Sequence, residues 1–423
     1  MAQERHTEPR RARLAGVDVA RGLALIGMFI AHLGVPLSAF AVSGEPYAIA
    51  SGGADPVNLA DRVAVLVFDA VSGRSAALFA LLAGVSLTFI AGRRDVVTSA
   101  ADRGRARVKI VVRAALLVLI GYLLASFHSA AVILHYYGLY FLLALPLLWL
   151  RGRVLALVGG LVILIGPTVG NLAYGATELF GEDWPSLILG TSHDPFFSYV
   201  LPRGPGAAFE LSAPTDGLLD LLATGLYPAV AFMGYVIAGM LVGRLDLRSA
   251  SVRARLVLGG LAGAVVGYGG SWVAVRALPD GLPTLFGVPA EDLVIAEPHS
   301  NTTFEVLGNT GAALVVLGLC LIVADRAGRL LDPLASVGTM TLTLYSAHIV
   351  LMWVTDPLGE GYGRISDVLA HDAELYLIAA FIVATVWRSR FGSGPMERML
   401  TRAANGTAER VLPREKPRTP VKT

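Results

Sequence analysis

The sequence predicts an all-α polytopic membrane protein, with about ten transmembrane helices in one bundle and both termini in the cytoplasm. Of its 423 residues, 55% are hydrophobic and 16% are charged, whereas about a quarter of the residues in a soluble domain are charged. Hydrophobic runs long enough to cross a ~30 Å hydrocarbon core recur along the chain. Arg and Lys gather in alternate connecting segments, although the net charge is only +2, and this alternation predicts the orientation.

Ten hydrophobic runs define the predicted helices. They cover residues 14–36, 73–91, 109–127, 130–150, 154–174, 218–242, 256–276, 304–324, 334–354 and 373–387. We expect residues 1–13 to form a basic cytoplasmic N-terminus and residues 14–398 to form the transmembrane domain. Residues 399–423 are predicted to be a basic, disordered cytoplasmic tail that is attracted to the membrane surface.

The connecting segments predict the topology. Arg and Lys are concentrated in residues 1–13, 92–108, 151–153, 243–255 and 325–333, and in the tail from residue 388. The alternate segments, residues 37–72, 175–217, 277–303 and 355–372, are rich in Gly and Pro and carry more acid than base. Because basic loops are retained in the cytoplasm, the first set is expected inside and the second set outside a cell membrane.

The first run carries three polar residues, Asp18, Arg21 and His32, that a simple membrane anchor would lack. Arg21 and His32 are separated by about 16 Å along a helix, so the cation would lie near one membrane face and the imidazole near mid-bilayer. Ionisable groups at that depth are costly, which indicates a functional site. In a purely structural alternative, Asp18 pairs with Arg21 and His32 is a packing residue.

The long outer segments are predicted to meet a soluble substrate. His299, Ser300 and Asn301 precede the eighth run, and Glu305 follows them; these residue types suit a general base or the binding of sugar hydroxyls. Helix capping by Ser300 or Asn301 with Glu305 is an equal alternative, and the two roles are compatible. Arg74, at the start of the second run, suggests a polar vestibule, although an ion pair within a loop would look the same.

The basic cluster between residues 93 and 113 should attract anions. It includes Arg105 and Arg107 in the loop and Arg113 inside the third run. Anionic lipid headgroups and a phosphate-bearing cofactor would both explain the loop residues. Arg113 differs because, within a helix, it needs a partner or an aqueous cavity.

Other polar residues in the runs are second candidates. His135 lies beside two tyrosines that could belong to an interfacial aromatic belt. Asn171, Asn309, Tyr345 and His348 lie within later runs, where polar groups often only hydrogen-bond neighbouring helices. The single cysteine, Cys320, excludes an intrachain disulfide and a cysteine-based metal cluster, and no metal is expected.

Several stretches resemble transmembrane acyltransferases. Residues 16–24, with Arg21-Gly22 and then His32, resemble the opening helix of the acyltransferase-3 family, in which a histidine at this spacing is taken to be catalytic. The chain is most similar to the bacterial domain-of-unknown-function 418 group, which is related to heparan-alpha-glucosaminide N-acetyltransferase. This similarity is carried by residues 78–87, by Leu134-His135-Tyr136-Tyr137-Gly138, by Pro298-His299-Ser300 before residues 304–308, and by residues 390–398.

The resemblance implies an enzyme that moves an acyl group, acetyl in the first instance, from cytoplasmic acyl-CoA to an extracytoplasmic acceptor such as an amino sugar or a glycan hydroxyl. The residues that it implies fall into three sets. Catalysis is assigned to His32, with His135 and His299 as further candidates; acyl-CoA binding to Asp18, Arg21, Arg105, Arg107 and Arg113; and acceptor binding to Ser300, Asn301, Glu305 and Arg74. The heparan enzyme has an asparagine at the place of His32 and its catalytic histidine in the next loop. This chain has no histidine between His32 and His128, so either His32 takes over the role or the activity differs.

Two functions of other classes stay open from the residues alone. A transporter or exporter of a small molecule or lipid-linked metabolite would also place polar residues among ten helices, although the sequence contains no evident inverted repeat. A non-enzymatic membrane sensor is the other alternative. In each case membrane lipids are partners, a homodimer is compatible with the sequence, and no nucleic-acid partner is expected.

Overall fold

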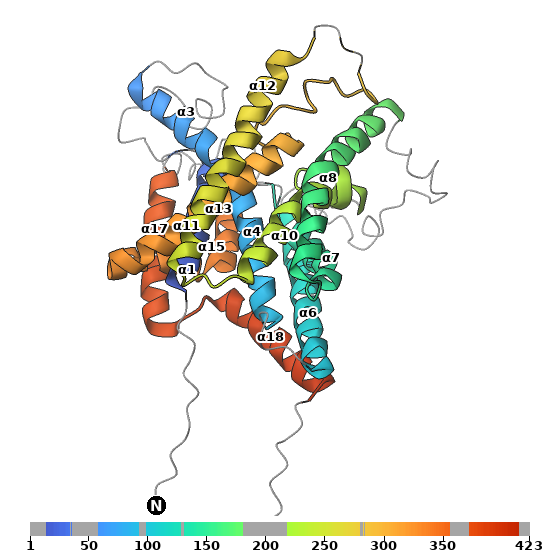
Figure 1. The fold of residues 1–423 in the computed structure, drawn as a ribbon. Coiled ribbons are helices and arrows are strands. Elements are labelled where there is room, and N and C mark those ends of the chain that lie inside the picture. Colours follow the sequence, from blue (N-terminus) through green and yellow to red (C-terminus); the bar gives the residue numbers. More distant parts are fainter. Residues whose placement is uncertain are drawn as a thin grey trace, which may run out of the picture.

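The computed structural model describes residues 14–33, 35, 58–92, 99–127, 131–180, 218–279, 282, 284–355 and 372–413. Across these residues the chain forms one bundle of packed helices (Figure 1), and no strand occurs in the part described. The helices are α1 (Ala15–Leu33), α3 (Leu59–Val71), α4 (Arg74–Ile90), α6 (Ala100–Ala125), α7 (Leu134–Ala144), α8 (Gly152–Phe180), α10 (Ala229–Gly243), α11 (Ala250–Ala264), α12 (Gly270–Ala277), α13 (Thr303–Ala327), α14 (Asp332–Gly338), α15 (Thr341–Thr355), α17 (Asp372–Phe391) and α18 (Pro395–Val411). The all-helical prediction is therefore confirmed for the described residues.

The number of membrane-spanning helices is confirmed only in part. Among the described residues, six helical segments are long and apolar enough to cross a membrane, or seven if the bent pair α17 and α18 is one span. Three shorter apolar helices, Leu134–Leu147, Ala229–Gly243 and Thr341–Val354, correspond to further predicted runs. A helix of about 15 residues is only about 22 Å long, which is less than the hydrocarbon thickness. Ten spans and cytoplasmic termini stay predictions.

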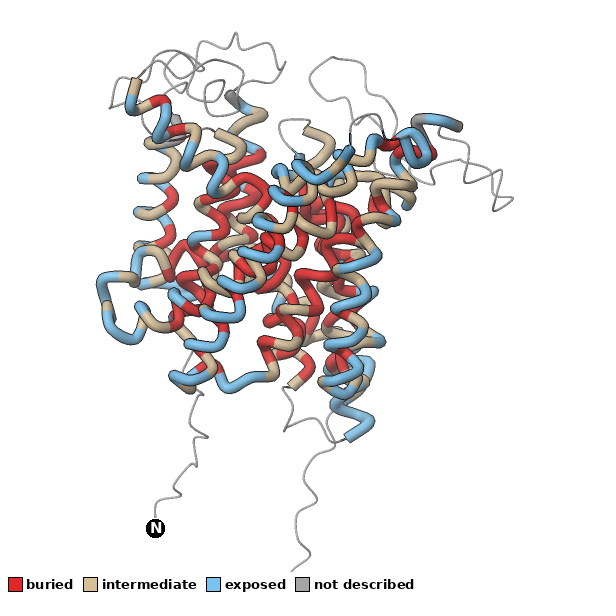
Figure 2. The backbone as a smooth tube through the Cα atoms, turned by 45° about the horizontal axis from the view of Figure 1, so that its top comes forward, coloured by how far each residue is buried: buried red, intermediate tan, exposed pale blue. Residues whose placement is uncertain are grey.

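Exposed and buried side chains separate as expected for a helical bundle in lipid. Figure 2 shows buried residues running through the middle of the bundle and exposed residues on its outer helices. The exposed side chains on α8 include Leu157, Leu161, Leu164 and Ile165. Such apolar side chains are unfavourable in water and suit a lipid-facing surface, since every helix satisfies its own backbone hydrogen bonds.

Small residues allow the central helices to approach closely. A Cβ atom added at Gly239 of α10 would overlap the carbonyl oxygen of Leu81 on α4, and one added at Gly84 of α4 would overlap that of Val236 on α10. The two backbones therefore touch on both sides of this crossing, as is common where helices pack in a membrane. This contact fixes α4, one wall of the site described below, against α10.

We predict that Gly239→Ala destabilises the protein by about 1–3 kcal/mol, because a buried methyl group must push two backbones apart. Gly259→Ala on α11 is the matched control, since an added Cβ there meets nothing within 4 Å, and alanine favours a helix over glycine by about 0.5–1 kcal/mol. Thermal unfolding in detergent measures both. Equal melting temperatures for the two variants would contradict the close packing of α4 on α10.

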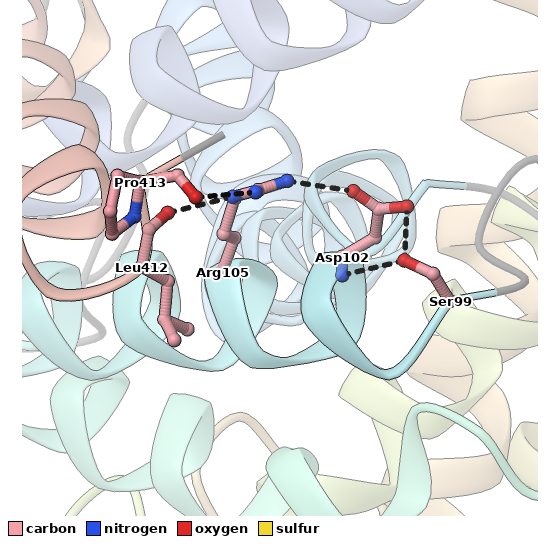
Figure 3. A network of polar contacts seen from close by, with 5 residues as sticks. All are labelled: Ser99, Asp102, Arg105, Leu412 and Pro413. Carbon is pink, nitrogen blue, oxygen red and sulfur yellow. Dashed lines mark hydrogen bonds and ion pairs between the residues drawn. The ribbon is translucent and has the colours of Figure 1, made fainter. Parts of the chain in front are cut away.

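The C-terminal tail corrects the prediction of disorder from residue 399. Helix α18 continues to Val411 and packs on α6, with Ala404 and Ala408 fully buried. In Figure 3, Arg105 of α6 donates from Nε to the carbonyl of Leu412 at 2.9 Å and from Nη2 to that of Pro413 at 3.1 Å. These bonds satisfy backbone carbonyls that a helix end leaves without partners. Small residues on one face of α18 and the hydrogen bonds from Arg105 thus order residues 399–413, although their composition predicts disorder. Residues 414–423 lie outside the described residues.

The orientation can be tested with single cysteines. Figure 1 places the start of α6 and helix α18 at one end of the bundle, and the connection from α12 to α13 at the other end. In a chain whose Cys320 is replaced first, we predict that cysteines at exposed Ser99 and Ser251 are protected from an impermeant thiol reagent in intact cells. A cysteine at exposed Glu291 is expected to react. Labelling of the Ser99 or Ser251 variant would overturn the predicted orientation.

Candidate functional site

A cavity of about 390 Å³ lies between α1, α4, α6, α7, α15 and α18; we call it the α18 cavity. Its polar lining comprises Arg21, Ser86, Arg113, Tyr137, Thr339, Thr341, Tyr345, Ser393, Glu397 and Thr401, and the rest is mainly Leu, Phe, Ala and Gly. Tyr137 and Tyr345 are buried side chains of this lining. The structure therefore brings Arg21 and Arg113, predicted from distant runs, to one cavity.

Arg21 is both paired and accessible from this cavity. Its Nη1 lies 3.3 Å from Oδ1 of Asp18, and its Nη2 donates to Oγ of Ser86 at 2.6 Å. Asp18 is buried and does not line the cavity. The structural alternative for Asp18 and Arg21 is thus realised, and it also orients the Arg21 guanidinium towards the cavity.

Arg113 has fewer partners. Its Nη2 lies 3.4 Å from Oγ1 of Thr401 on α18, and its Nε is buried without a hydrogen-bond acceptor. Among the described residues, no carboxylate forms an ion pair with Arg113. A guanidinium in a largely apolar wall favours a ligand that supplies negative charge or carbonyl oxygens, because leaving a partly buried cation uncompensated is costly.

Arg105 and Arg107 were predicted in a loop but lie in α6, and neither lines the α18 cavity. Arg105 pairs with Asp102 at 3.1 Å in addition to its bonds to the end of α18. The guanidinium of Arg107 stacks over the ring of Trp149, 4.9 Å from its centroid. The predicted binding of acyl-CoA phosphates by Arg105 and Arg107 is therefore a proposal. It requires that both arginines keep these contacts while the ligand is bound.

The two histidines His32 and His348 form a pair between α1 and α15. Nδ1 of His32 lies 2.9 Å from Nε2 of His348, and the rings stack at a centroid distance of 5.2 Å. His32 is in the last turn of α1, which begins at Ala15 and ends at Leu33. Its predicted position near mid-bilayer stays a prediction. His348 is completely buried between the rings of Phe29 and Tyr345, each 4.8 Å away.

A second cavity of about 320 Å³ contains His299, Ser300 and Asn301 in its wall; we call it the His299 cavity. The remaining lining comes from α8, from residues 223–228 and from the start of α10. Asn171 on α8 donates from Nδ2 to the carbonyl of Asn301 at 3.5 Å. Burial lowers the pKa of His299 below its usual value, so this imidazole is neutral at physiological pH and can accept a proton.

Glu305 holds the loop that presents these three residues. Its carboxylate accepts hydrogen bonds from the backbone N–H groups of His299 at 3.0 Å and Asn301 at 2.6 Å, and from Oγ of Ser300 at 3.2 Å. His299 and Asn301 have positive φ values of 66° and 49°, a strained conformation that needs such support. Glu305 does not line the cavity, so the structure gives it a positioning role.

Arg74 belongs to the same polar network, behind the His299 cavity. It donates from Nε to the hydroxyl of Tyr268 at 2.9 Å, and Tyr268 donates to Oδ1 of Asn309 at 2.6 Å. Asn309 in turn donates to Glu305 at 3.0 Å. Arg74 therefore supports the loop through three intermediate side chains and does not line the cavity.

The histidine pair borders the α18 cavity through Tyr345, which lines that cavity and packs its ring on His348. His299 lines the second cavity. His32 and His348 themselves line neither cavity.

Two family models match separate parts of this arrangement. The model described as heparan-alpha-glucosaminide N-acetyltransferase, catalytic, matches residues 13–199, and the model described as protein of unknown function (DUF418) matches residues 272–407. The chain is therefore similar to both families, each over less than half of its length. No curated protein matches the chain. The more distant resemblance to the acyltransferase-3 family stays a prediction.

The match to the acetyltransferase model suggests a membrane acetyltransferase-like function. Each part of the site combines the two matched regions: Arg21 and Arg113 face Thr341 and Glu397 across the α18 cavity, and His32 meets His348. Among the described residues, no group of three or more His, Cys, Asp or Glu side chains could hold a metal ion.

The remaining histidine candidate lies elsewhere. His135 of α7 is buried, stacks on Tyr122 at 4.8 Å and contacts Tyr136; it lines neither cavity. By contrast, His348 is only a second candidate in the sequence. A histidine within an apolar run was the available signal, but nothing in the sequence pairs residue 32 with residue 348.

Proposed function

We propose that this protein transfers an acyl group, acetyl in the first instance, from cytoplasmic acyl-CoA to an acceptor outside the cytoplasm. The observation that carries this proposal is Arg113, a guanidinium in the wall of the α18 cavity with no carboxylate partner among the described residues. Such a group needs an anionic or carbonyl-bearing ligand. The match to the catalytic domain of an acetyltransferase supports the same ligand class.

The dimensions of the α18 cavity support a bound acyl-pantetheine arm. A volume of about 390 Å³ is suited to the acyl-pantetheine arm. The nucleotide of acyl-CoA stays outside the cavity, near α6 and α18. In this proposal Arg21 and Arg113 bind carbonyl or phosphate oxygens. Arg105 and Arg107 are further candidates for the phosphates at the entrance, and Asp18 holds Arg21 in position.

His32 is the proposed base. It takes the proton from an acceptor amine or hydroxyl while the acceptor forms a bond to the acyl carbon and the carbon–sulfur bond breaks. The protonated His32 then gives this proton to the sulfur, and coenzyme A leaves as the thiol. In the other route, His32 first accepts the acyl group from the thioester, which releases coenzyme A, and the acyl-histidine then passes the acyl group to the acceptor. Either route requires the acyl group to pass Tyr345, which separates the α18 cavity from His348.

The His299 cavity is the proposed acceptor site. Its polar groups are uncharged at neutral pH: the imidazole of His299, the hydroxyl of Ser300, and the amides of Asn171 and Asn301. Groups of this kind both donate to and accept from hydroxyls, which supports a sugar or glycan acceptor. An amino sugar can be bound in the same way if its amine is neutral when it reacts.

The test is thiol release by the purified protein in detergent or proteoliposomes. With acetyl-CoA and a mixture of amino sugars and glycans, we expect free coenzyme A to appear faster than in protein-free samples, and the label from acetyl-CoA to appear in the acceptor. Absence of both, for acyl chains of several lengths, would remove the enzymatic proposal. Uptake of a ligand without any thiol release would instead favour the transporter.

A further inference from the structure

We infer that the corner between α3 and α4, residues 71–75, positions the acceptor loop, residues 298–301, relative to the helix that carries His32. We call residues 71–75 the α3–α4 corner. This inference rests on the proposed function and deepens it, because it identifies what holds the His299 cavity against the helix of the proposed base. The α3–α4 corner lines neither cavity, so its role acts through the residues that it contacts.

One side of the α3–α4 corner packs on α1. A Cβ atom added at Gly27 of α1 would overlap the side chain of Ser75, so the two segments touch without room for a further atom. Helix α3 extends this contact, since its fully buried Ala64 lies in one apolar cluster with Ile30 of α1. The α3–α4 corner and α3 are therefore packed along α1 to within two residues of His32.

The other side of the corner lies against the acceptor loop. A Cβ atom added at Gly73 would be 3.1 Å from Oε1 of Glu305 and 3.4 Å from Cα of Pro298. Gly73 also has a φ of 68°, which residues with a side chain rarely adopt. Oε1 of Glu305 is the atom that accepts the hydrogen bond of the His299 backbone N–H. The backbone of the corner therefore contacts the carboxylate that holds the acceptor loop, and a glycine permits this approach.

Arg74 connects the corner to the same carboxylate by side-chain hydrogen bonds. Its Nε donates to the hydroxyl of Tyr268, and the series of bonds continues through Asn309 to Oε1 of Glu305. The guanidinium carbon also lies 4.9 Å from the centroid of the Tyr268 ring, and Nη1 donates to the carbonyl of Asp69 near the end of α3. The backbone contact and these hydrogen bonds thus reach one carboxylate oxygen by two separate routes.

The corner lies at the end of the bundle where α1 ends and α13 begins. Figure 1 places α3 and the connection from α12 to α13 at this same end. At the opposite end of α1, a Cβ atom added at Gly16 would overlap the backbone of Leu321 on α13. At the His32 end, the α3–α4 corner contacts α1 on one side and the acceptor loop on the other. A shift of the corner therefore moves the acceptor loop relative to His32.

The experiment compares Gly73→Ala with a matched glycine. Gly328 also has a positive φ, 49°, but a Cβ atom added there meets nothing within 4 Å. Strain of the backbone should affect both alanine variants, whereas only Gly73→Ala pushes on the acceptor loop. With acetyl-CoA and glucosamine as the acceptor probe, we expect Gly73→Ala to lower kcat/KM for glucosamine about 10–100-fold, because small misplacements of reacting groups are costly. Gly328→Ala should keep its kcat/KM, and both variants should bind acetyl-CoA as the wild type does.

Tyr268→Phe tests the second route without strain in the backbone. It removes the hydroxyl that joins Arg74 to Asn309 and keeps the aromatic ring. We expect kcat/KM for glucosamine to fall about 2–10-fold, which corresponds to the loss of one hydrogen bond, with unchanged binding of acetyl-CoA. This variant decides the inference if Gly73→Ala does not fold.

Hydrogen–deuterium exchange of the acceptor loop gives a readout that does not depend on turnover. The backbone N–H groups of His299 and Asn301 donate to Glu305, so we expect them to exchange faster in Gly73→Ala and Tyr268→Phe than in the wild type and Gly328→Ala. This exchange pattern in a protein that transfers no acyl group would overturn only the proposed function. Unchanged exchange in the folded Gly73→Ala and Tyr268→Phe variants, or equal losses of kcat/KM in Gly73→Ala and Gly328→Ala, would overturn the role of the α3–α4 corner.

Discussion

His32→Ala is expected to lower the rate of acyl transfer by about 10²–10⁴-fold, the range typical for loss of an acid–base group. The physical reason is that no neighbouring side chain is placed to replace His32 as the base, because His348 and Tyr345 are buried and packed against each other. Binding of acetyl-CoA should stay close to that of the parent, because the α18 cavity does not include His32. Steady-state kinetics of thiol release, together with equilibrium binding, measure both effects.

The control for this variant is His135→Ala, which removes a buried imidazole from α7 outside both cavities. His32→Asn adds a second comparison, since the related heparan enzyme carries an asparagine at this place and a histidine in the following loop. We expect the asparagine variant to be inactive in this chain. Full turnover of His32→Ala would make His32 a packing residue, and the search for the base would move to His299.

Arg113→Gln is expected to weaken acyl-CoA binding about ten- to hundredfold, since a hydrogen bond to a charged group contributes about 1.5–3 kcal/mol. Its thermal stability should stay level or rise. The reason is that Arg113 has no carboxylate partner among the described residues and a buried Nε without an acceptor, so its removal relieves a desolvation cost. A structural arginine would behave in the opposite way, losing stability and keeping its affinity.

Arg255→Gln provides the matched charge control, because this exposed arginine on α11 hydrogen-bonds Ser251 of its own helix and lines neither cavity. Affinity for acetyl-CoA and melting temperature are measured for both variants in the same detergent. If Arg113→Gln binds acetyl-CoA as tightly as Arg255→Gln does, the α18 cavity is not the donor site. The basic cluster would then be better explained by contacts with anionic lipid headgroups.

The sequence predicted the class of the fold well because hydrophobic length and charge asymmetry are local properties. The predicted runs coincide with helices, including the short α7, α10 and α15, although only six or seven segments meet a length criterion for spanning. The tail was predicted less well. Composition favoured disorder, whereas the burial of Ala404 and Ala408 on α6 is a tertiary contact that no local pattern reveals.

The candidate site was likewise predicted only in part from the sequence. Residue type and depth were enough to single out Arg21, Arg113 and His32, because an ionisable side chain in an apolar helix is costly wherever it lies. The roles of Glu305 and Arg74 could not be predicted, since a carboxylate that binds a sugar and one that holds a strained loop look alike in sequence. Arg105 likewise required the structure, because its acceptors are carbonyls about 300 residues away.

By itself, the sequence determined that this protein is a helical membrane protein with ionisable residues in its helices, because those features follow from composition and spacing. Only the tertiary structure decided which of these residues meet. The pairing of His32 with His348, and the convergence of Arg21 and Arg113 on one cavity, depend on how α1, α6, α15 and α18 pack. Packing of that kind depends on many weak contacts distributed over the whole chain, and no single segment encodes it.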